Sequence, residues 1–247
     1  MKPMQLIPVE WPAHQSVHCV VTSRKGGCSE APFDSLNLAL HVGDDPARVA
    51  ENRAALQTHC PDVNEWQWLQ QVHGAQVHRL ESAQTNLRGD GLITQKRGLA
   101  CCIMTADCLP VLLCDELGKE IAAVHCGWRS LAQGILENTI TKMSSKPDSL
   151  LAWLGPAIGP CHFEVGKDVK DALVAGNVSS VSESQFSPIG EGKFLANLYG
   201  IARMQLESQG IGRTFGSDFC TYCDSDQFYS YRRDRQCGRM VSAIYLA

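Results

Sequence analysis

Two short apolar segments lead to residues that can do chemistry. Residues 99–104 run toward Cys108, and residues 121–124 lead directly to His125. Because both segments have the composition of buried strands, we expect the thiol and the imidazole to lie at one edge of a sheet. A cysteine beside a histidine can be a nucleophile with its base, a pair of metal ligands, or two buried residues. The two residues alone leave these three interpretations open.

A second histidine adds a third donor to this pair. His73 stands before Gly74, where an expected strand meets a turn. One thiolate and two imidazoles suit a tetrahedral zinc ion, and a fourth position would stay open for water, as in catalytic zinc sites. No C-x-x-C or H-x-x-H spacing supports this set, so zinc binding is one hypothesis beside nucleophilic catalysis.

Another pair of cysteines, Cys220 and Cys223, has the C-x-x-C spacing of metal and redox sites. The chain has no second cysteine pair at matching spacing, and aromatic residues flank the motif. We therefore expect a structural role for this pair.

The composition is that of a globular protein with no nucleic-acid or membrane partner. The 247 residues are 44% hydrophobic and 19% charged, and the formal net charge of -4 argues against a nucleic-acid-binding surface. No apolar stretch approaches the ~20 residues that a membrane span needs. The first residues do not look like a signal peptide. The twelve cysteines are therefore expected to be mostly reduced and buried, in a cytoplasmic protein.

The hydrophobic pattern alternates between strand-like and helix-like segments. Strands are expected at 16–22, 75–80, 99–104, 111–114, 121–124, 150–154 and 240–246. Helices are expected at 46–59 with Asp45 as the cap, at 130–145, from 167 onward before a serine-rich linker that ends near 193, and at 195–210. No repeat or domain boundary interrupts this order. The pattern predicts an α/β fold in which residues 1–247 form a single domain, with a mixed central β-sheet flanked by helices.

Three motifs follow one another in the order Gln71-Val72-His73-Gly74, Thr105-Ala106-Asp107-Cys108-Leu109-Pro110 and Val124-His125-Cys126-Gly127-Trp128-Arg129. Shorter segments accompany them, namely Asn37-Leu38, His41-Val42-Gly43-Asp44-Asp45, Asn52-Arg53, Asp90-Gly91-Leu92-Ile93-Thr94, Gly155-Pro156-Ala157-Ile158-Gly159-Pro160-Cys161 and Ser230-Tyr231-Arg232-Arg233. From about Arg24 to its end, the chain resembles the YfiH/laccase-domain family, whose members are also called polyphenol oxidases or purine nucleoside phosphorylases.

The resemblance implies a YfiH-like α/β domain in which His73, Cys108 and His125 bind zinc. It implies phosphorolysis of adenosine, inosine and methylthioadenosine, and deamination of adenosine. The partners would then be a small-molecule nucleoside and phosphate, and the protein would be a monomer or a homodimer. Copper could occupy the same site, because the affinity order of divalent metals favours it over zinc. Ala39 and His162-Phe163 depart from the family pattern, which puts fine substrate contacts in doubt but not the metal ligands.

Phosphorolysis requires cations for the phosphate and a group that steadies the leaving base. Arg24, beside the turn Gly26-Gly27, and Arg53 and Arg129 are the candidate cations, and Arg129 is closest in sequence to His125. Asn37 is a further candidate for substrate binding. In deamination, a carboxylate would move protons while zinc activates water. Asp107, next to Cys108, and Glu164 are the candidate carboxylates.

Two other activities stay open. In a Cys-His hydrolase or deamidase, Cys108 would be the nucleophile and His125 its base, with Arg129 nearby. A copper-binding polyphenol oxidoreductase is the second alternative. The chain has eight histidines but no H-x-H pair, so it does not have the residues for the multicopper cluster of a true laccase.

Overall fold

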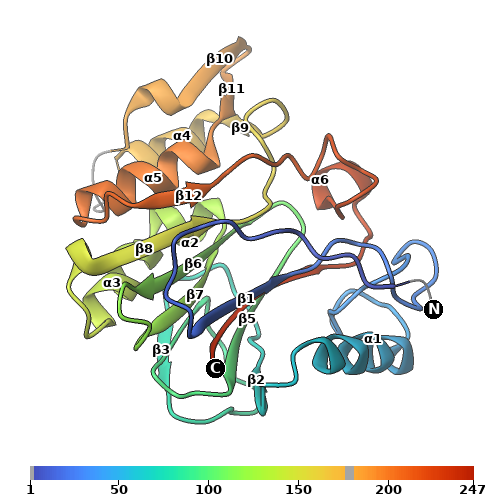
Figure 1. Cartoon of the computed structure of the whole chain (residues 1–247). Coiled ribbons are helices and arrows are strands. Elements are labelled where there is room, and N and C mark those ends of the chain that lie inside the picture. Colours follow the sequence, from blue (N-terminus) through green and yellow to red (C-terminus); the bar gives the residue numbers. More distant parts are fainter. Residues whose placement is uncertain (1–2, 176–180) are drawn as a thin grey trace.

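The computed structural model describes residues 3–175 and 181–247 (Figure 1). The strands are β1 (Val17–Val21), β2 (Glu65–Gln67), β3 (Val77–Leu80), β4 (Gly91–Thr94), β5 (Leu99–Thr105), β6 (Leu109–Asp115), β7 (Ile121–Cys126), β8 (Leu150–Leu154), β9 (Glu164–Gly166), β10 (Phe186–Gly190), β11 (Lys193–Ala196), β12 (Thr214–Gly216) and β13 (Met240–Leu246). The α-helices are α1 (Pro46–His59), α2 (Trp128–Ala132), α3 (Ile135–Lys142), α4 (Lys167–Val174), α5 (Leu198–Ser208) and α6 (Tyr231–Asp234).

The strands of the described residues form sheets in the orders β1-β13-β5-β2, β10-β11-β9 and β12-β8-β6-β7-β4-β3. The predicted α/β class is therefore confirmed, but the expected central sheet is divided. Figure 1 shows the small sheet β10-β11-β9 at one end of the molecule, together with α4 and α5. The two larger sheets and the loops between their strands carry His73, Cys108 and His125.

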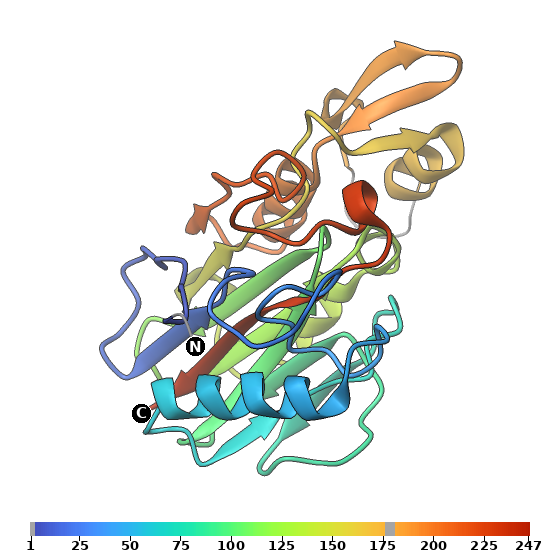
Figure 2. The same ribbon diagram turned by 90° about the vertical axis from the view of Figure 1, so that its right-hand side faces the viewer.

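These two larger sheets pack face to face, and side chains of β5 lie in the interface between them. Side chains alternate along a strand, so Cys101 and Ile103 face the six-stranded sheet, in one cluster with Trp153. Cys102 lies in another cluster with Leu56 of α1, on the opposite face. In Figure 2, α1 lies on that outer side of the sheet containing β13. The adjacent cysteines thus serve two separate cores as small apolar side chains.

Helices cover the far face of the six-stranded sheet. Val111 of β6 and Val124 of β7 pack with Ile135 of α3 and Ile201 of α5. Every residue of β6 and β7 is buried, because both faces of the sheet are covered. This double burial explains the near-continuous apolar runs of β6, which follows Cys108, and of β7, which leads to His125.

Most predicted elements are confirmed, and the differences have local causes. The helix at 46–59 forms as predicted, and the Asp45 carboxylate accepts a hydrogen bond from the Ala47 amide. The single helix expected at 130–145 is instead two helices, because Gly134 takes a left-handed φ of 79° between them. The hairpin of β10 and β11 replaces much of the expected linker, of which residues 176–180 lie outside the described residues. The helix expected from 195 begins after its cap, Asn197.

The first and last strands of the chain are hydrogen-bonded neighbours. β1 pairs with β13 in antiparallel register from Val17 with Leu246 to Val21 with Ser242. This pairing favours the prediction that residues 1–247 form one domain, which stays a prediction. None of the described helices is long and apolar enough to cross a membrane.

Leu112→Ala is expected to lower the free energy of unfolding by about 2–5 kcal/mol, because it leaves a cavity between the two large sheets. Leu112 is fully buried, whereas Leu117 is 58% exposed. The matched control Leu117→Ala should therefore stay within about 0.5 kcal/mol of the unsubstituted protein. Urea unfolding followed by circular dichroism measures both variants. Equal losses of stability would contradict the proposed packing of the sheets.

Candidate metal centre

The three predicted metal ligands converge in the structure. His73 lies in the loop between β2 and β3, Cys108 in the turn between β5 and β6, and His125 in β7. Their ligand atoms all lie within 4.8 Å of one another. Nε2 of His73 is 3.8 Å from Sγ of Cys108, and the two imidazole rings meet edge to face at 4.8 Å.

The carboxylate of Asp90 holds two of these ligands together. It accepts hydrogen bonds from Nδ1 of His125 at 2.8 Å and from the amides of His73 at 3.0 Å and Gly74 at 2.8 Å. With Nδ1 occupied, His125 is left with Nε2 for a metal ion. Burial raises the pKa of Asp90, but the hydrogen bonds from His125 and the loop amides outweigh burial and hold the pKa below its usual value. We expected no role for Asp90 from sequence, although the motif Asp90-Gly91-Leu92-Ile93-Thr94 contains it.

Asp107 shapes the turn that carries Cys108. Its φ of 103° is unusual for a residue with a side chain, so the turn needs outside support. The carboxylate accepts hydrogen bonds from Oγ1 of Thr221 and from the amide of Arg232, both at 2.7 Å. The carbonyl of Asp107 accepts one from the Ile158 amide at 2.9 Å. Both carboxylate oxygens of this predicted catalytic residue are therefore engaged in positioning the turn.

The donor set and the space around it fit a zinc ion. Bonds of ~2.3 Å to sulfur and ~2.0–2.1 Å to nitrogen in a tetrahedron place S and N ~3.6 Å apart, close to the separation of His73 and Cys108. A Cβ at Gly127 would lie 3.1 Å from Cδ2 of His73 and 3.2 Å from Sγ of Cys108. Glycine therefore keeps the space beside the ligands free.

The charges at the centre favour a thiolate. Burial raises the pKa of Cys108, but the charge and hydrogen bonds of His125 and His73 outweigh burial and lower the pKa to about 6. Burial lowers the pKa of His125, but the thiolate and Asp90 outweigh burial and raise it to about 9. Thiolate is the form of cysteine that binds metals.

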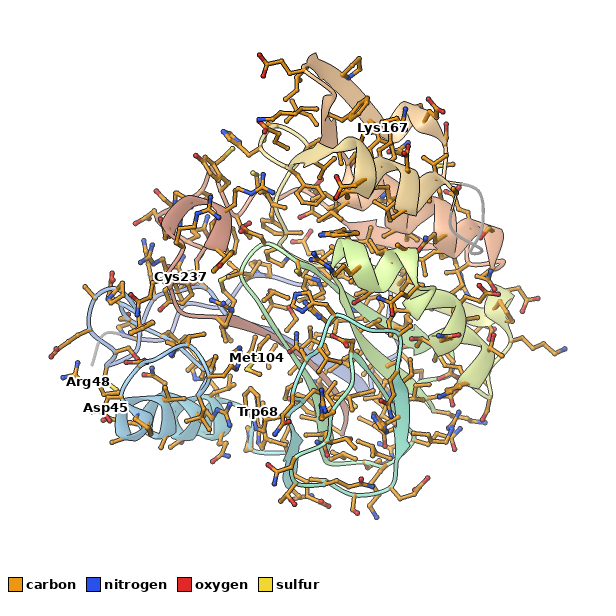
Figure 3. The ribbon with its side chains drawn as sticks, turned by 180° about the vertical axis from the view of Figure 1, so that it is seen from behind. Asp45, Arg48, Trp68, Met104, Lys167 and Cys237 are labelled. Atoms are coloured by element: carbon orange, nitrogen blue, oxygen red, sulfur yellow. The ribbon has the colours of Figure 1, made fainter. Side chains whose placement is uncertain are left out.

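A pocket of about 310 Å³ opens beside the three ligands. Its lining includes the cationic side chains of Arg232 and Arg239 and the aromatic rings of Trp128, Phe163 and Tyr231. Met104, which also lines it, is labelled near the middle of the molecule in Figure 3. A volume of this size, apolar walls and a few charged groups are typical of small-molecule sites.

The four residues predicted to bind substrate lie elsewhere, outside this lining. Arg24 donates to Asp34 and to the Ser225 carbonyl, and buried Asn37 bonds Ala39 and Asp44. Arg53 donates to the Leu38 carbonyl and lies over Trp68, and exposed Arg129 lies over Trp128.

Other parts of the predicted site serve the fold. The amides of Gly26 and Gly27 donate to Ser35, so the turn beside Arg24 uses these amides internally. The Glu164 carboxylate pairs with Lys193 at 2.8 Å and does not line the pocket. The pocket's cations are instead Arg232 and Arg239. The motif Ser230-Tyr231-Arg232-Arg233 is the one feature of the sequence that points to Arg232 as a site residue.

Comparison with known proteins places the whole chain in one family. Residues 18–247 match the family described as multi-copper polyphenol oxidoreductase laccase. A purine nucleoside phosphorylase of Pseudomonas aeruginosa is 47% identical, over 96% of each chain. The purine nucleoside phosphorylase YfiH of Escherichia coli is 44% identical, over 98% of this chain and 99% of its own.

Solved structures agree with this fold over almost the whole chain. A Neisseria meningitidis protein aligns with a TM-score of 0.92 and 42% identity, covering 99% of both chains. YlmD from Geobacillus stearothermophilus aligns with a TM-score of 0.89 and 29% identity, over 100% of this chain and 99% of its own. The predicted YfiH/laccase-domain resemblance is thereby confirmed.

Asp90→Asn is expected to weaken zinc binding by about 10–100-fold, the usual loss when a partner of a ligating histidine is changed. The substituted side chain would place an NH2 donor where a carboxylate oxygen now accepts hydrogen bonds from His125 and the loop amides. Competition with a coloured chelator measures the affinity. Asp226→Asn is the matched control, because the Asp226 side chain is 81% exposed and pairs with Lys25. Unchanged affinity in Asp90→Asn would contradict the role given to this carboxylate.

Proposed function

The chain belongs to the multi-copper polyphenol oxidoreductase laccase family, and we propose that it is a zinc-dependent purine nucleoside phosphorylase. One observation carries the proposal: the His73, Cys108 and His125 cluster opens onto a pocket with both cationic and aromatic walls. The names of the Pseudomonas and Escherichia relatives support the substrate class. Adenosine, inosine and methylthioadenosine are the proposed substrates.

The phosphate would lie against the cationic wall. Arg239 and Arg232 both line the pocket, as does His41. The pKa of His41 is lowered by burial and then by the positive charges of Arg239 and Arg53. This positive potential suits a phosphate dianion. Arg53 lies outside the lining and would add to this potential from there.

The purine would lie against the aromatic wall. Phe163, Trp128 and Tyr231 line this wall, each with an arginine over one face of its ring, and Ile158 and Leu198 add apolar surface. Such walls hold a flat base and exclude water, while the cations hold phosphate for attack on the ribose anomeric carbon. Attack forms the C–O bond to phosphate, and the C–N bond breaks with its electron pair leaving on the purine.

A zinc ion held by His73, Cys108 and His125 would supply Lewis-acid chemistry at this pocket. Asp90 keeps His125 oriented with Nε2 toward the other ligands, and Asp107 holds Cys108 in its turn. We propose deamination of adenosine in the same pocket as a second activity. Asp107 is its candidate proton carrier by position alone, since Asp107 lines the pocket and Glu164 does not, while both Asp107 oxygens already accept hydrogen bonds.

One geometric feature favours a second candidate function, a Cys-His hydrolase or deamidase. Asp90 orients His125, and His125 lies beside Cys108, which is the order of groups in a cysteine–histidine–carboxylate triad. Activity of metal-free protein that is abolished by Cys108→Ser would support this candidate. The family description also keeps a copper-binding polyphenol oxidoreductase as an alternative. The cytoplasmic location and the monomeric or homodimeric state stay predictions.

Zinc-loaded protein is expected to release hypoxanthine from inosine only when phosphate is present. Removing the metal with a chelator should abolish release, and adding zinc back should restore it. A coupled assay for hypoxanthine measures this, and ammonia release from adenosine without phosphate measures the proposed deamination. Equal release of hypoxanthine with and without phosphate would make the protein a hydrolase.

Arg239→Ala is expected to raise the KM for phosphate by about 10–100-fold, because a hydrogen bond to a charged group contributes about 1.5–3 kcal/mol. Arg88→Ala is the matched control, since Arg88 is exposed and lies outside the pocket lining. Initial rates over a range of phosphate concentrations give the KM for phosphate of both variants. A KM for phosphate that Arg239→Ala leaves unchanged would remove Arg239 from the phosphate site.

A further inference from the structure

Two loops far apart in sequence bring four more metal-binding side chains together. Cys161 and His162 follow β8, and Cys220 and Cys223 follow β12. Their ligand atoms all lie within 4.8 Å of one another. None of the four lines the pocket. We propose that they form a second, structural zinc site of the Cys₃His type, independent of the proposed catalytic function.

The distances suit a tetrahedral ion. Sγ of Cys161 lies 3.6 Å from Sγ of Cys220 and 3.5 Å from Sγ of Cys223. Nδ1 of His162 lies 3.2 Å from Sγ of both Cys161 and Cys223. Zinc bonds of ~2.3 Å to sulfur and ~2.0–2.1 Å to nitrogen set ideal separations of ~3.8 Å between sulfurs and ~3.6 Å between S and N. Small outward shifts of these side chains would therefore accommodate the ion.

Neighbouring groups already orient the donors. The Gly159 amide donates to Sγ of Cys220 at 3.2 Å, and such hydrogen bonds stabilise a ligating thiolate. A Cβ at Gly159 would lie 3.0 Å from Cβ of Cys220 and 3.4 Å from Sγ of Cys161, so a larger residue would crowd the cluster. The ring of His162 stacks on Tyr222 with centroids 4.1 Å apart, which holds its plane.

The donor count favours a structural site over a catalytic one or a disulfide. Four protein ligands fill a tetrahedron and leave no position open for substrate, unlike the three-ligand centre at His73. A disulfide would join two of the sulfurs and would not account for the third thiol and the imidazole in the same cluster. Cys161 and Cys223 are exposed, so a bound ion would also protect these thiolates from oxidation.

The second site would hold one wall of the pocket in place. Ile158 and Phe163, which line the pocket, lie on the same loop as Cys161 and His162. Thr221, between the two other ligands, bonds the Ala157 carbonyl with its amide and Asp107 with its hydroxyl. A zinc ion here would therefore tie that wall to the turn that carries Cys108.

Metal analysis of the full chain after zinc loading tests the proposal. The unsubstituted protein is expected to bind about two zinc ions per chain, one in each tetrahedral site. The double variant Cys161→Ser/Cys223→Ser and the variant His73→Ala should each keep about one, lost from different sites. Cys28→Ser is the matched control, because this half-buried cysteine lies outside both clusters, and it should keep both ions.

Cobalt substitution identifies which site each variant loses. A Cys₃ donor set gives a stronger sulfur-to-cobalt charge-transfer absorption than a single cysteine. The strong absorption should persist in His73→Ala and disappear in Cys161→Ser/Cys223→Ser. If the double variant does not fold, thiol labelling of the unsubstituted protein decides, because zinc should protect Cys161 and Cys223 from reaction. A single ion per chain that His73→Ala loses and Cys161→Ser/Cys223→Ser keeps, or a disulfide within the cluster after anaerobic purification, would overturn the proposal.

Discussion

The candidate metal centre depends on the hydrogen bonds that the Asp90 carboxylate accepts. This carboxylate lies fully buried immediately before β4, yet it stays ionised because the His125 ring and the amides of the 72–74 loop surround it with donors. A buried carboxylate without such partners would be costly. Asp90 therefore links the loop of His73 to the strand of His125. This one carboxylate holds both imidazole side chains close together.

The sheets bring the third ligand to this place. β6 and β7 are antiparallel neighbours, with Pro110 paired to His125, so the turn before β6 lies beside the end of β7. Complete burial of both strands fixes their register, because a shift by one residue would reverse every side chain. The turn itself is strained at Asp107 and is supported by Thr221 and Arg232 from the C-terminal part of the chain. The candidate metal centre thus depends on contacts between segments far apart in sequence.

The sequence predicted what local pattern determines and missed what depends on tertiary contacts. The helix at 46–59 and the strand at 240–246 follow from capping and apolar patterns, and the structure confirms them. The three ligands were named from residue type and family resemblance, and they converge. Arg239 could not be placed, since its position in the pocket follows from the fold. The partner of Cys220 and Cys223 was missed for a similar reason: it is a Cys-His pair on another loop, not a second C-x-x-C motif.

We propose that the pocket beside His73, Cys108 and His125 transfers the sugar of a purine nucleoside to phosphate. The most direct measurement is 31P NMR of the products when zinc-loaded protein acts on inosine in phosphate buffer. We expect a ribose 1-phosphate signal that grows in step with hypoxanthine and is absent with the His73→Ala variant. Hypoxanthine accompanied by free ribose and no sugar phosphate would contradict it.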